Sequence, residues 1–339
     1  MIPIEYVTAW VVVVAVIAYV VLGGADFGAG VWDLLASGER KNAQRDLIER
    51  AIGPIWEANH IWLIVVIVVM FVCFPRAFAM LATALHVPLT LMLLGIVARG
   101  TAFVFRAYDA HEDRARLVWG RIFSVASALT PILLGLCLGT TLSGALVWND
   151  DGIYVGGFFE PWLRLFPWLV GLMALSVFAF LAAVFLTVEA DDELLKQDFR
   201  KRALASGVAV GVFAWSARLQ AHVGAPEFAR RLSTEWWSWP LVVVASIIAI
   251  GALYALWTRR DTLARTLVVL QTVLVVGGFA GALFPDMVLG ELTLVEAAAT
   301  RSMHVLVLGT LGVGSLILIP SLIYLFRIFK GPKAFKLLR

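Results

Sequence analysis

Nine long apolar runs dominate this sequence, and each has about the length that an α-helix needs to cross a membrane. A membrane-spanning helix takes roughly 17–25 mostly apolar residues. The 339-residue chain is 61% hydrophobic and 15% charged, whereas soluble proteins carry about 25% charged residues. The sequence therefore predicts a polytopic membrane protein and excludes a soluble globular or disordered one. The expected spans are residues 7–35, 52–74, 79–105, 121–147, 166–188, 203–220, 239–257, 264–284 and 303–328.

All nine spans are expected to be α-helices, which gives an all-α fold class. Inside a bilayer the backbone must satisfy its own hydrogen bonds, and these runs are too long and too evenly apolar for barrel strands. Short connections make sequential helices antiparallel neighbours. We expect a single membrane domain over residues 1–339, with one four-helix bundle at 1–148, a second four-helix bundle at 149–290, and a ninth helix with a basic tail at 291–339.

Basic residues gather in alternate connections between the predicted spans. Twenty of the 27 Lys and Arg residues follow the odd-numbered spans, and six lie in the opposite set. Because basic loops resist translocation, the N-terminus is predicted outside and the C-terminus in the cytoplasm. The net charge of +3 gives no reason to expect a nucleic-acid partner. The first run follows Glu5 without a basic region before it, so no cleaved signal peptide is expected.

Three ionisable side chains fall inside the first three predicted spans at similar depths. At about 1.5 Å per helical residue, Asp26, Glu57 and Arg99 lie roughly 8–13 Å from the cytoplasmic boundary. Unpaired charges are costly at that depth, so the sequence predicts a buried charge cluster. An ion pair between Asp26 and Arg99 that only fixes helix packing is an equally good explanation, because buried ion pairs often set helix register.

The functional hypothesis for these side chains is a proton path from the cytoplasm. Asp33 lies at the predicted inner end of the first span, and Asp26 is seven residues away on the same helix face. A carboxyl group in a partly dry site can exchange protons near neutral pH. Glu57 and His60 are three residues apart and could extend the path. The candidate path residues are therefore Asp26, Asp33, Glu57 and His60, with Arg99 as the buried charge partner.

Three alternatives use the same residues differently. Glu57 and His60 have the spacing of a di-metal ligand pair, but a bundle site needs two such motifs and two further acids, so no metal is expected. His60, His86 or His304 could ligate haem in an electron carrier. A secondary transporter or proton-coupled carrier would also bury charges, although transporter helices usually break in corresponding positions of two halves.

Four segments of the first 110 residues point to one family. They are GADFGAG at 24–30, IGPIWEANHIWL at 52–63, FPRAFA at 74–79 and RGTAFVFR at 99–106. Occurring in this order, they resemble subunit II of the cytochrome bd-type ubiquinol oxidases, a group that includes the cyanide-insensitive oxidases. Beyond residue 110 the resemblance consists of the span pattern and the short basic C-terminus. Gly23 stands where relatives often have an acid, and Glu57 where they often have Asp.

The resemblance implies a haem-free subunit of a quinol:oxygen oxidoreductase in an aerobic respiratory chain. Its partner, the haem-bearing subunit I, would carry three haems, oxidise ubiquinol or menaquinol on the outer side and reduce dioxygen to water. This chain would support assembly of that subunit and conduct protons from the cytoplasm, with Trp62 lining a route for dioxygen. The expected location is the bacterial cytoplasmic (inner) membrane, in contact with lipid. The resemblance leaves room for a small single-span accessory subunit and for a structural quinone or lipid.

Overall fold

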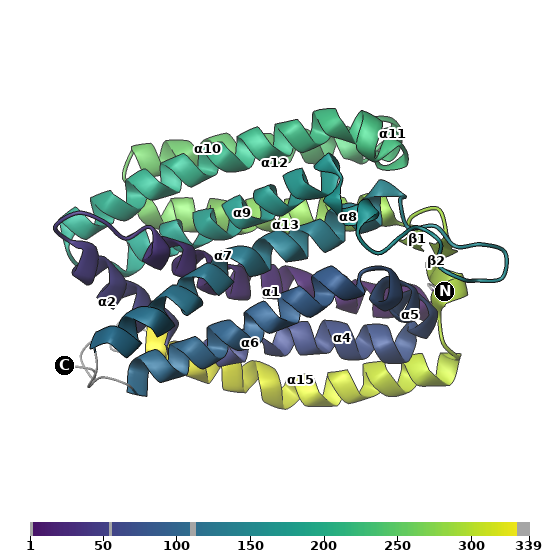
Figure 1. Cartoon of the computed structure of the whole chain (residues 1–339), viewed down its shortest axis with the longest axis horizontal. Helices are drawn as coiled ribbons and strands as arrows, with labels where there is room; N and C mark the ends of the chain where they lie inside the picture. The colour runs from purple at the N-terminus through teal and green to yellow at the C-terminus, as the bar shows by residue number, and fades with distance from the viewer. Residues whose placement is uncertain (1–2, 54–55, 109–112, 331–339) are drawn as a thin grey trace.

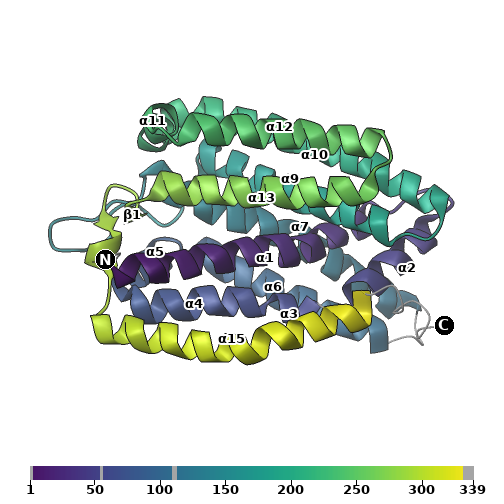
Figure 2. The ribbon, with the colours of Figure 1, turned by 180° about the vertical axis from the view of Figure 1, so that it is seen from behind.

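A computed structural model describes residues 3–53, 56–108 and 113–330 and shows an almost entirely helical chain. The long helices run roughly along one axis (Figure 1), and the view from behind shows the same arrangement (Figure 2). The helices and strands are α1 (Ile4–Leu34), α2 (Lys41–Ile52), α3 (Trp56–Asn59), α4 (Ile61–Cys73), α5 (Pro75–Ala84), α6 (His86–Tyr108), α7 (Asp113–Ser143), α8 (Glu160–Leu163), α9 (Leu165–Glu189), α10 (Glu193–Gly224), α11 (Pro226–Thr234), α12 (Ser238–Trp257), α13 (Asp261–Leu283), β1 (Asp286–Val288), β2 (Leu292–Thr293), α14 (Leu294–Ala297) and α15 (Arg301–Lys330).

Eight helical segments of the described residues are long and apolar enough to cross a membrane. They confirm the prediction of a polytopic all-α membrane protein. The remaining predicted span, 203–220, lies within α10, a 32-residue helix. The Lys and Arg residues of α10 are Lys196, Arg200, Lys201 and Arg202 near its start and Arg218 inside the predicted span. The count of nine spans and the outside position of the N-terminus stay predictions.

The predicted third span, 79–105, was wrong at its start. A short helix, α5, ends at Ala84, and the membrane-crossing helix α6 begins anew at His86. Pro88 has no N–H to donate to the carbonyl of residue 84, and it lies in the first turn of α6, where no such hydrogen bond is needed. The membrane-crossing stretch is therefore His86–Arg106.

Helix α1 lies at the centre of the bundle and approaches its neighbours through small residues. A Cβ atom at Gly28 would come within 3 Å of the carbonyl oxygen of Phe178 on α9, and one at Gly30 would overlap Ser127 on α7. The Trp32 indole N–H donates to the carbonyl oxygen of Ala179 at 2.8 Å. Close backbone approach at small residues is a main source of helix association in membranes, so these positions fix α1 against α7 and α9.

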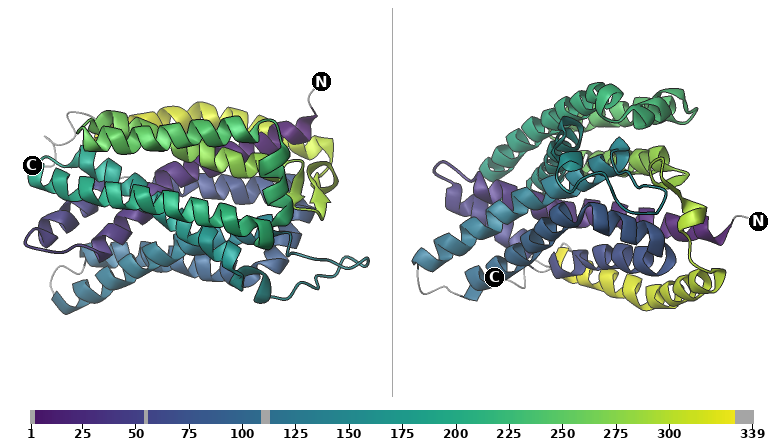
Figure 3. Two further views of the ribbon diagram at one scale, coloured as in Figure 1. Left: turned by 90° about the horizontal axis from the view of Figure 1, so that it is seen from above. Right: turned by 45° about the vertical axis from the view of Figure 1, so that its right-hand side comes forward.

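The largest buried apolar cluster takes side chains from both predicted halves of the chain. It includes Phe27 and Phe123 from the first half together with Phe178, Phe199 and Ala252 from the second. Figure 3 shows the helices of both halves side by side in two further views. The buried cluster thus continues across the proposed boundary between the two halves. The division into two four-helix bundles stays a prediction.

The end of the bundle that carries the N-terminus also carries α11 (Figure 1). There Arg231 joins α11 to the end of α13. Its guanidinium lies 2.6 Å from the Asp286 carboxylate, and both side chains are largely buried. The same guanidinium donates to the carbonyl oxygens of Ala282, Leu283 and Phe284. These carbonyls are at the end of a helix and have no partner within it, so Arg231 supplies the hydrogen bonds that they lack.

Replacing Arg231 by Gln is expected to destabilise the protein by about 3 kcal/mol, because breaking one side of a largely buried ion pair leaves the other charge unpaired. The adjacent Arg230 is the matched control: its side chain is 58% exposed and pairs with Glu227, so Arg230→Gln should change stability by less than about 1 kcal/mol. Thermal unfolding of the purified protein, followed by helical circular dichroism, measures both. Equal melting temperatures for the two variants would contradict this role of Arg231.

Candidate proton-transfer site

Asp26 is the centre of the buried polar site. It lies on α1 between the close-packed glycines and is 4% exposed. The Asn59 side-chain amide, on the single turn of α3, donates to the Asp26 carboxylate at 2.5 Å. Asn59 is itself 1% exposed, and its amide also lies 3.5 Å from the carbonyl oxygen of Leu22. The buried hydrogen bond from Asn59 therefore fixes the position of the carboxylate and links α1 to α3.

Arg99, on α6, supplies the positive charge of this site. Its side chain is 1% exposed, and the guanidinium carbon lies 4.6 Å from the centre of the Phe27 ring and 5.3 Å from that of Phe123. Cation–π contacts stabilise a desolvated guanidinium at such distances. Arg99 interacts electrostatically with Asp26 and Tyr19. The structure thus brings together the acid and the base that the sequence predicted to share a buried cluster.

Some polar atoms in this region are buried without a hydrogen-bond partner among the described residues. They are Nε and Nη2 of Arg99 and Oδ1 of Asn59. Buried donors and acceptors of this kind are usually satisfied by internal water. Arg99 and Asn59 therefore offer hydrogen-bond donors and an acceptor to internal water close to Asp26.

Asp33, two turns further along α1, is buried in a second charge cluster. Its carboxylate lies 3.1 Å from Arg106 and 3.8 Å from Arg45, and the Ser124 hydroxyl donates to it at 2.7 Å. Arg106 also lies 3.4 Å from the carboxylate of Glu49. Side chains from α2, α6 and α7 therefore meet at the end of α1 that is predicted to face the cytoplasm.

The structure corrects the expected burial of Glu57. Its side chain is exposed, whereas His60 is half-buried, with its ring 6.0 Å from those of Tyr19 and Phe27. The helix is interrupted at His60, where Nδ1 lies 3.0 Å from the carbonyl oxygen of Trp56. Sequence reasoning missed Asn59, although a polar amide in an apolar run two residues from an acid was the available signal.

The remaining predicted residues lie in separate places. Trp62 is half-buried, and its indole nitrogen is buried without a hydrogen-bond partner among the described residues. His86 is exposed and lies 3.0 Å from the carbonyl oxygen of Thr83, while the buried His304 lies 2.9 Å from the Thr8 hydroxyl. Within the described ranges, no group of three or more His, Cys, Asp or Glu side chains could hold a metal ion.

The fold and the site define a class of protein: a membrane protein of many helices with a buried carboxylate, Asp26, close to a buried arginine, Arg99. The family model for cytochrome bd terminal oxidase subunit II matches residues 4–329, so the chain belongs to this family. The match extends the resemblance of the first 110 residues over nearly the whole chain. A multi-pass chain of this family lies in the inner membrane of a bacterium.

Individual relatives agree with the family assignment. Cytochrome bd ubiquinol oxidase subunit 2 of Bacillus subtilis is 29% identical over 147 residues, 43% of each chain. Cytochrome bd-I ubiquinol oxidase subunit 2 of Escherichia coli K12 is 27% identical over 205 residues, 59% of this chain and 52% of the relative. A putative cytochrome bd menaquinol oxidase subunit II of B. subtilis is 28% identical over 196 residues, 57% of this chain and 55% of the relative. The chain therefore spans about half the length of these curated relatives.

The fold also matches a solved structure over nearly its full length. The bd oxidase of Geobacillus thermodenitrificans superposes with a TM-score of 0.75, covering 96% of this chain and 98% of the matched chain at 20% identity. At this identity the match establishes the arrangement of the helices.

Proposed function

We propose that this chain is the haem-free second subunit of a membrane quinol:oxygen oxidoreductase, and that it conducts protons from the cytoplasm toward the site of dioxygen reduction. Family membership over residues 4–329 supports the place in the complex. The haems and the quinol chemistry belong to subunit I in this proposal, and the present chain supports the assembly of that partner. The names of its relatives include both ubiquinol and menaquinol oxidases, so either quinol is compatible.

The observation that carries the proton-transfer role is the buried Asp26 carboxylate, hydrogen-bonded by Asn59 and coupled electrostatically to Arg99. A carboxyl group is a suitable proton carrier when its surroundings are dry and its hydrogen bonds are preorganised. Asp33, seven residues away on the same helix, is roughly 10 Å distant along the axis. Its cluster with Arg45 and Arg106 would be the entry, and Asp26 the next station.

Glu57 is the proposed exit toward the partner subunit. Its exposed carboxylate lies two residues before Asn59, which contacts Asp26. A carboxylate facing lipid within an apolar segment is costly. Contact with subunit I at this position would remove that cost and place an acid at the boundary between the two chains. In the same segment, the half-buried His60 faces Tyr19 and Phe27 of α1. Trp62 remains the proposed lining residue of a dioxygen route. A lipid or quinone bound to this chain, and a small accessory subunit, are compatible with the proposal.

Replacing Glu57 by Gln tests the exit role. Gln keeps the size of the side chain but cannot release a proton, so quinol-driven oxygen consumption by the purified complex is expected to fall at least about tenfold. The haem absorption spectrum should stay unchanged, because Glu57 is not part of the packed core. Glu57→Asp, which retains the carboxyl group, is the matched control and should keep most of the activity. Full activity of Glu57→Gln at every pH would rule out an essential proton role.

A further inference from the structure

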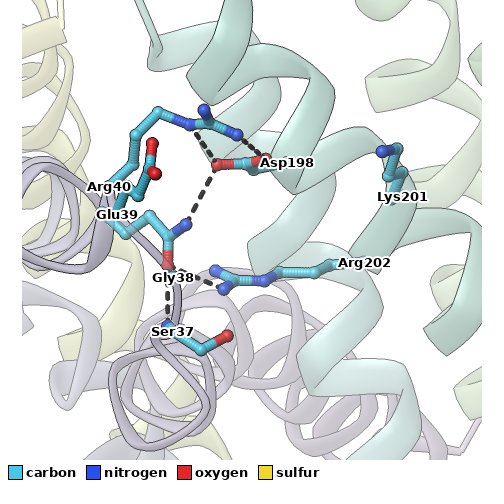
Figure 4. Close-up of a pocket in the computed structure, with 8 residues that line it drawn as sticks. Ser37, Gly38, Glu39, Arg40, Asp198, Lys201 and Arg202 are labelled. Carbon is cyan, nitrogen blue, oxygen red and sulfur yellow. Dashed lines mark hydrogen bonds and ion pairs between the residues drawn. The ribbon is translucent and has the colours of Figure 1, made fainter.

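A cavity of about 460 Å³ lies where the connection between α1 and α2 passes the first turns of α10. Figure 4 shows its side chains, which come from two parts of the chain that are far apart in the sequence. It lies at the end of α1 opposite the N-terminus, outside the membrane-crossing stretches. The lining residues are Ser37, Gly38, Glu39, Arg40, Gln44, Asp198, Lys201 and Arg202.

A network of hydrogen bonds fixes one wall of this cavity. Arg40 donates to the Asp198 carboxylate through Nε at 2.8 Å and through Nη2 at 2.7 Å, and the Gln44 amide donates to the same carboxylate at 3.0 Å. Arg202 donates to the Gln44 side-chain oxygen at 2.7 Å. The hydrogen bonds from Arg40 hold the pKa of Asp198 below its ordinary value of 3.8. Asp198 is therefore ionised at neutral pH, and its charge is committed to Arg40.

The charge that remains in the cavity is positive. Three cations line the cavity against two acids. Arg40 and Asp198 neutralise each other, so Lys201 and Arg202 remain against Glu39. Within the described part of the chain, the exposed Lys201 takes part in no ion pair. The cavity also opens beside the amino-terminal end of α2, a 12-residue helix with no acidic residue in its first turn and no side-chain cap. Such helix ends attract anions.

We propose that this cavity binds a phosphate-bearing anion, with Lys201 as the principal cationic contact. The volume is sufficient for a phosphate group together with the atoms attached to it. Basic pockets at the cytoplasmic ends of membrane helices suit the headgroups of anionic phospholipids, and a soluble phosphate presents the same chemistry. Neither the proton path nor the subunit assignment is needed for this inference.

The test uses the purified complex in detergent and measures thermal stabilisation by phosphatidylglycerol, by phosphatidylcholine and by inorganic phosphate. A basic residue near a membrane surface contributes about 1 kcal/mol to the binding of anionic lipid. Lys201→Gln, which removes one charge, should therefore weaken the apparent affinity for phosphatidylglycerol about fivefold. Lys201→Glu, which reverses the charge, should weaken it about thirtyfold. Lys196 is on the same helix but does not line the cavity. The matched Lys196→Gln and Lys196→Glu variants should bind within about twofold of the unmodified complex.

The arms of the experiment distinguish the sources of the phosphate. Stabilisation by phosphatidylglycerol that depends on Lys201, without a response to inorganic phosphate, supports a lipid headgroup. A response to inorganic phosphate that depends on Lys201 supports a soluble anion. The proposal is overturned if neither probe stabilises the complex, or if the variants at positions 201 and 196 lose binding equally.

Discussion

Asp26→Asn is expected to reduce quinol-driven oxygen consumption at least about tenfold, because a positioned proton-transfer group typically contributes about 10²–10⁴-fold to a rate. Asn has nearly the same shape as Asp and can still contact Asn59, but it cannot carry a proton. The substitution also leaves Arg99 with less negative charge nearby. Because an uncompensated buried charge costs about 3–5 kcal/mol, the amount of assembled complex should fall as well.

A second substitution separates these two effects. In Asp26→Asn combined with Arg99→Leu, the uncompensated charge is gone, so the amount of assembled complex should recover. Turnover per assembled complex should stay low, since the proton carrier is still missing. Recovery of both assembly and turnover would show that Asp26 and Arg99 only hold the helices together. Asp26→Glu, which keeps the acid, is the control for loss of the carboxyl group.

Gly28→Ala is expected to have the largest effect of any single methyl group in the chain. The added Cβ would come within 3 Å of the Phe178 carbonyl oxygen and would lie 2.8 Å from the Cβ of Ala182. A backbone carbonyl in a packed helix cannot move aside as a flexible side chain can. Overpacking of this kind costs about 3 kcal/mol or more, so the assembled complex should fall below about a tenth of its normal amount.

Gly277→Ala is the matched control for this substitution. Gly277 also lies in a long apolar helix, α13, but a Cβ there would meet no atom within 4 Å. Ala is favoured over Gly in a helix by about 1 kcal/mol, so this variant should assemble normally. The yield of complex in membranes, measured by haem absorbance and by immunoblot of this chain, compares the two. Equal yields would contradict the close α1–α9 contact.

The sequence could predict the features that depend on the average hydrophobicity of segments of about 20 residues. The membrane-crossing helices follow from apolar runs of sufficient length, and the burial of Asp26 and Arg99 follows from the cost of exposing charges to lipid. The sequence could not show that Asn59 is the hydrogen-bond partner of Asp26, because that contact depends on the register of α1 against α3. Nor could it show that Glu57 is exposed, since the side of α3 that faces α1 depends on the same register.

Local interruptions account for the other differences. Periodicity alone could not separate α5 from α6, because the apolar residue Leu85 joins them and only Pro88 indicates a new helix start. The clusters around Asp33 and Asp198 join residues up to 158 positions apart, a pairing that single-sequence reasoning has no means of finding. The sequence thus shows which ionisable residues could take part in chemistry, but it does not show most of the residues that contact them.

Proton uptake by the complex in proteoliposomes tests the central claim most directly. The fully reduced complex is mixed with dioxygen, and a pH-sensitive dye reports proton uptake from the side that corresponds to the cytoplasm. The account predicts that Asp26→Asn combined with Arg99→Leu assembles normally but takes up protons at least about tenfold more slowly than the unmodified complex. Proton uptake at the unmodified rate in this double variant would contradict a proton-carrying role for Asp26.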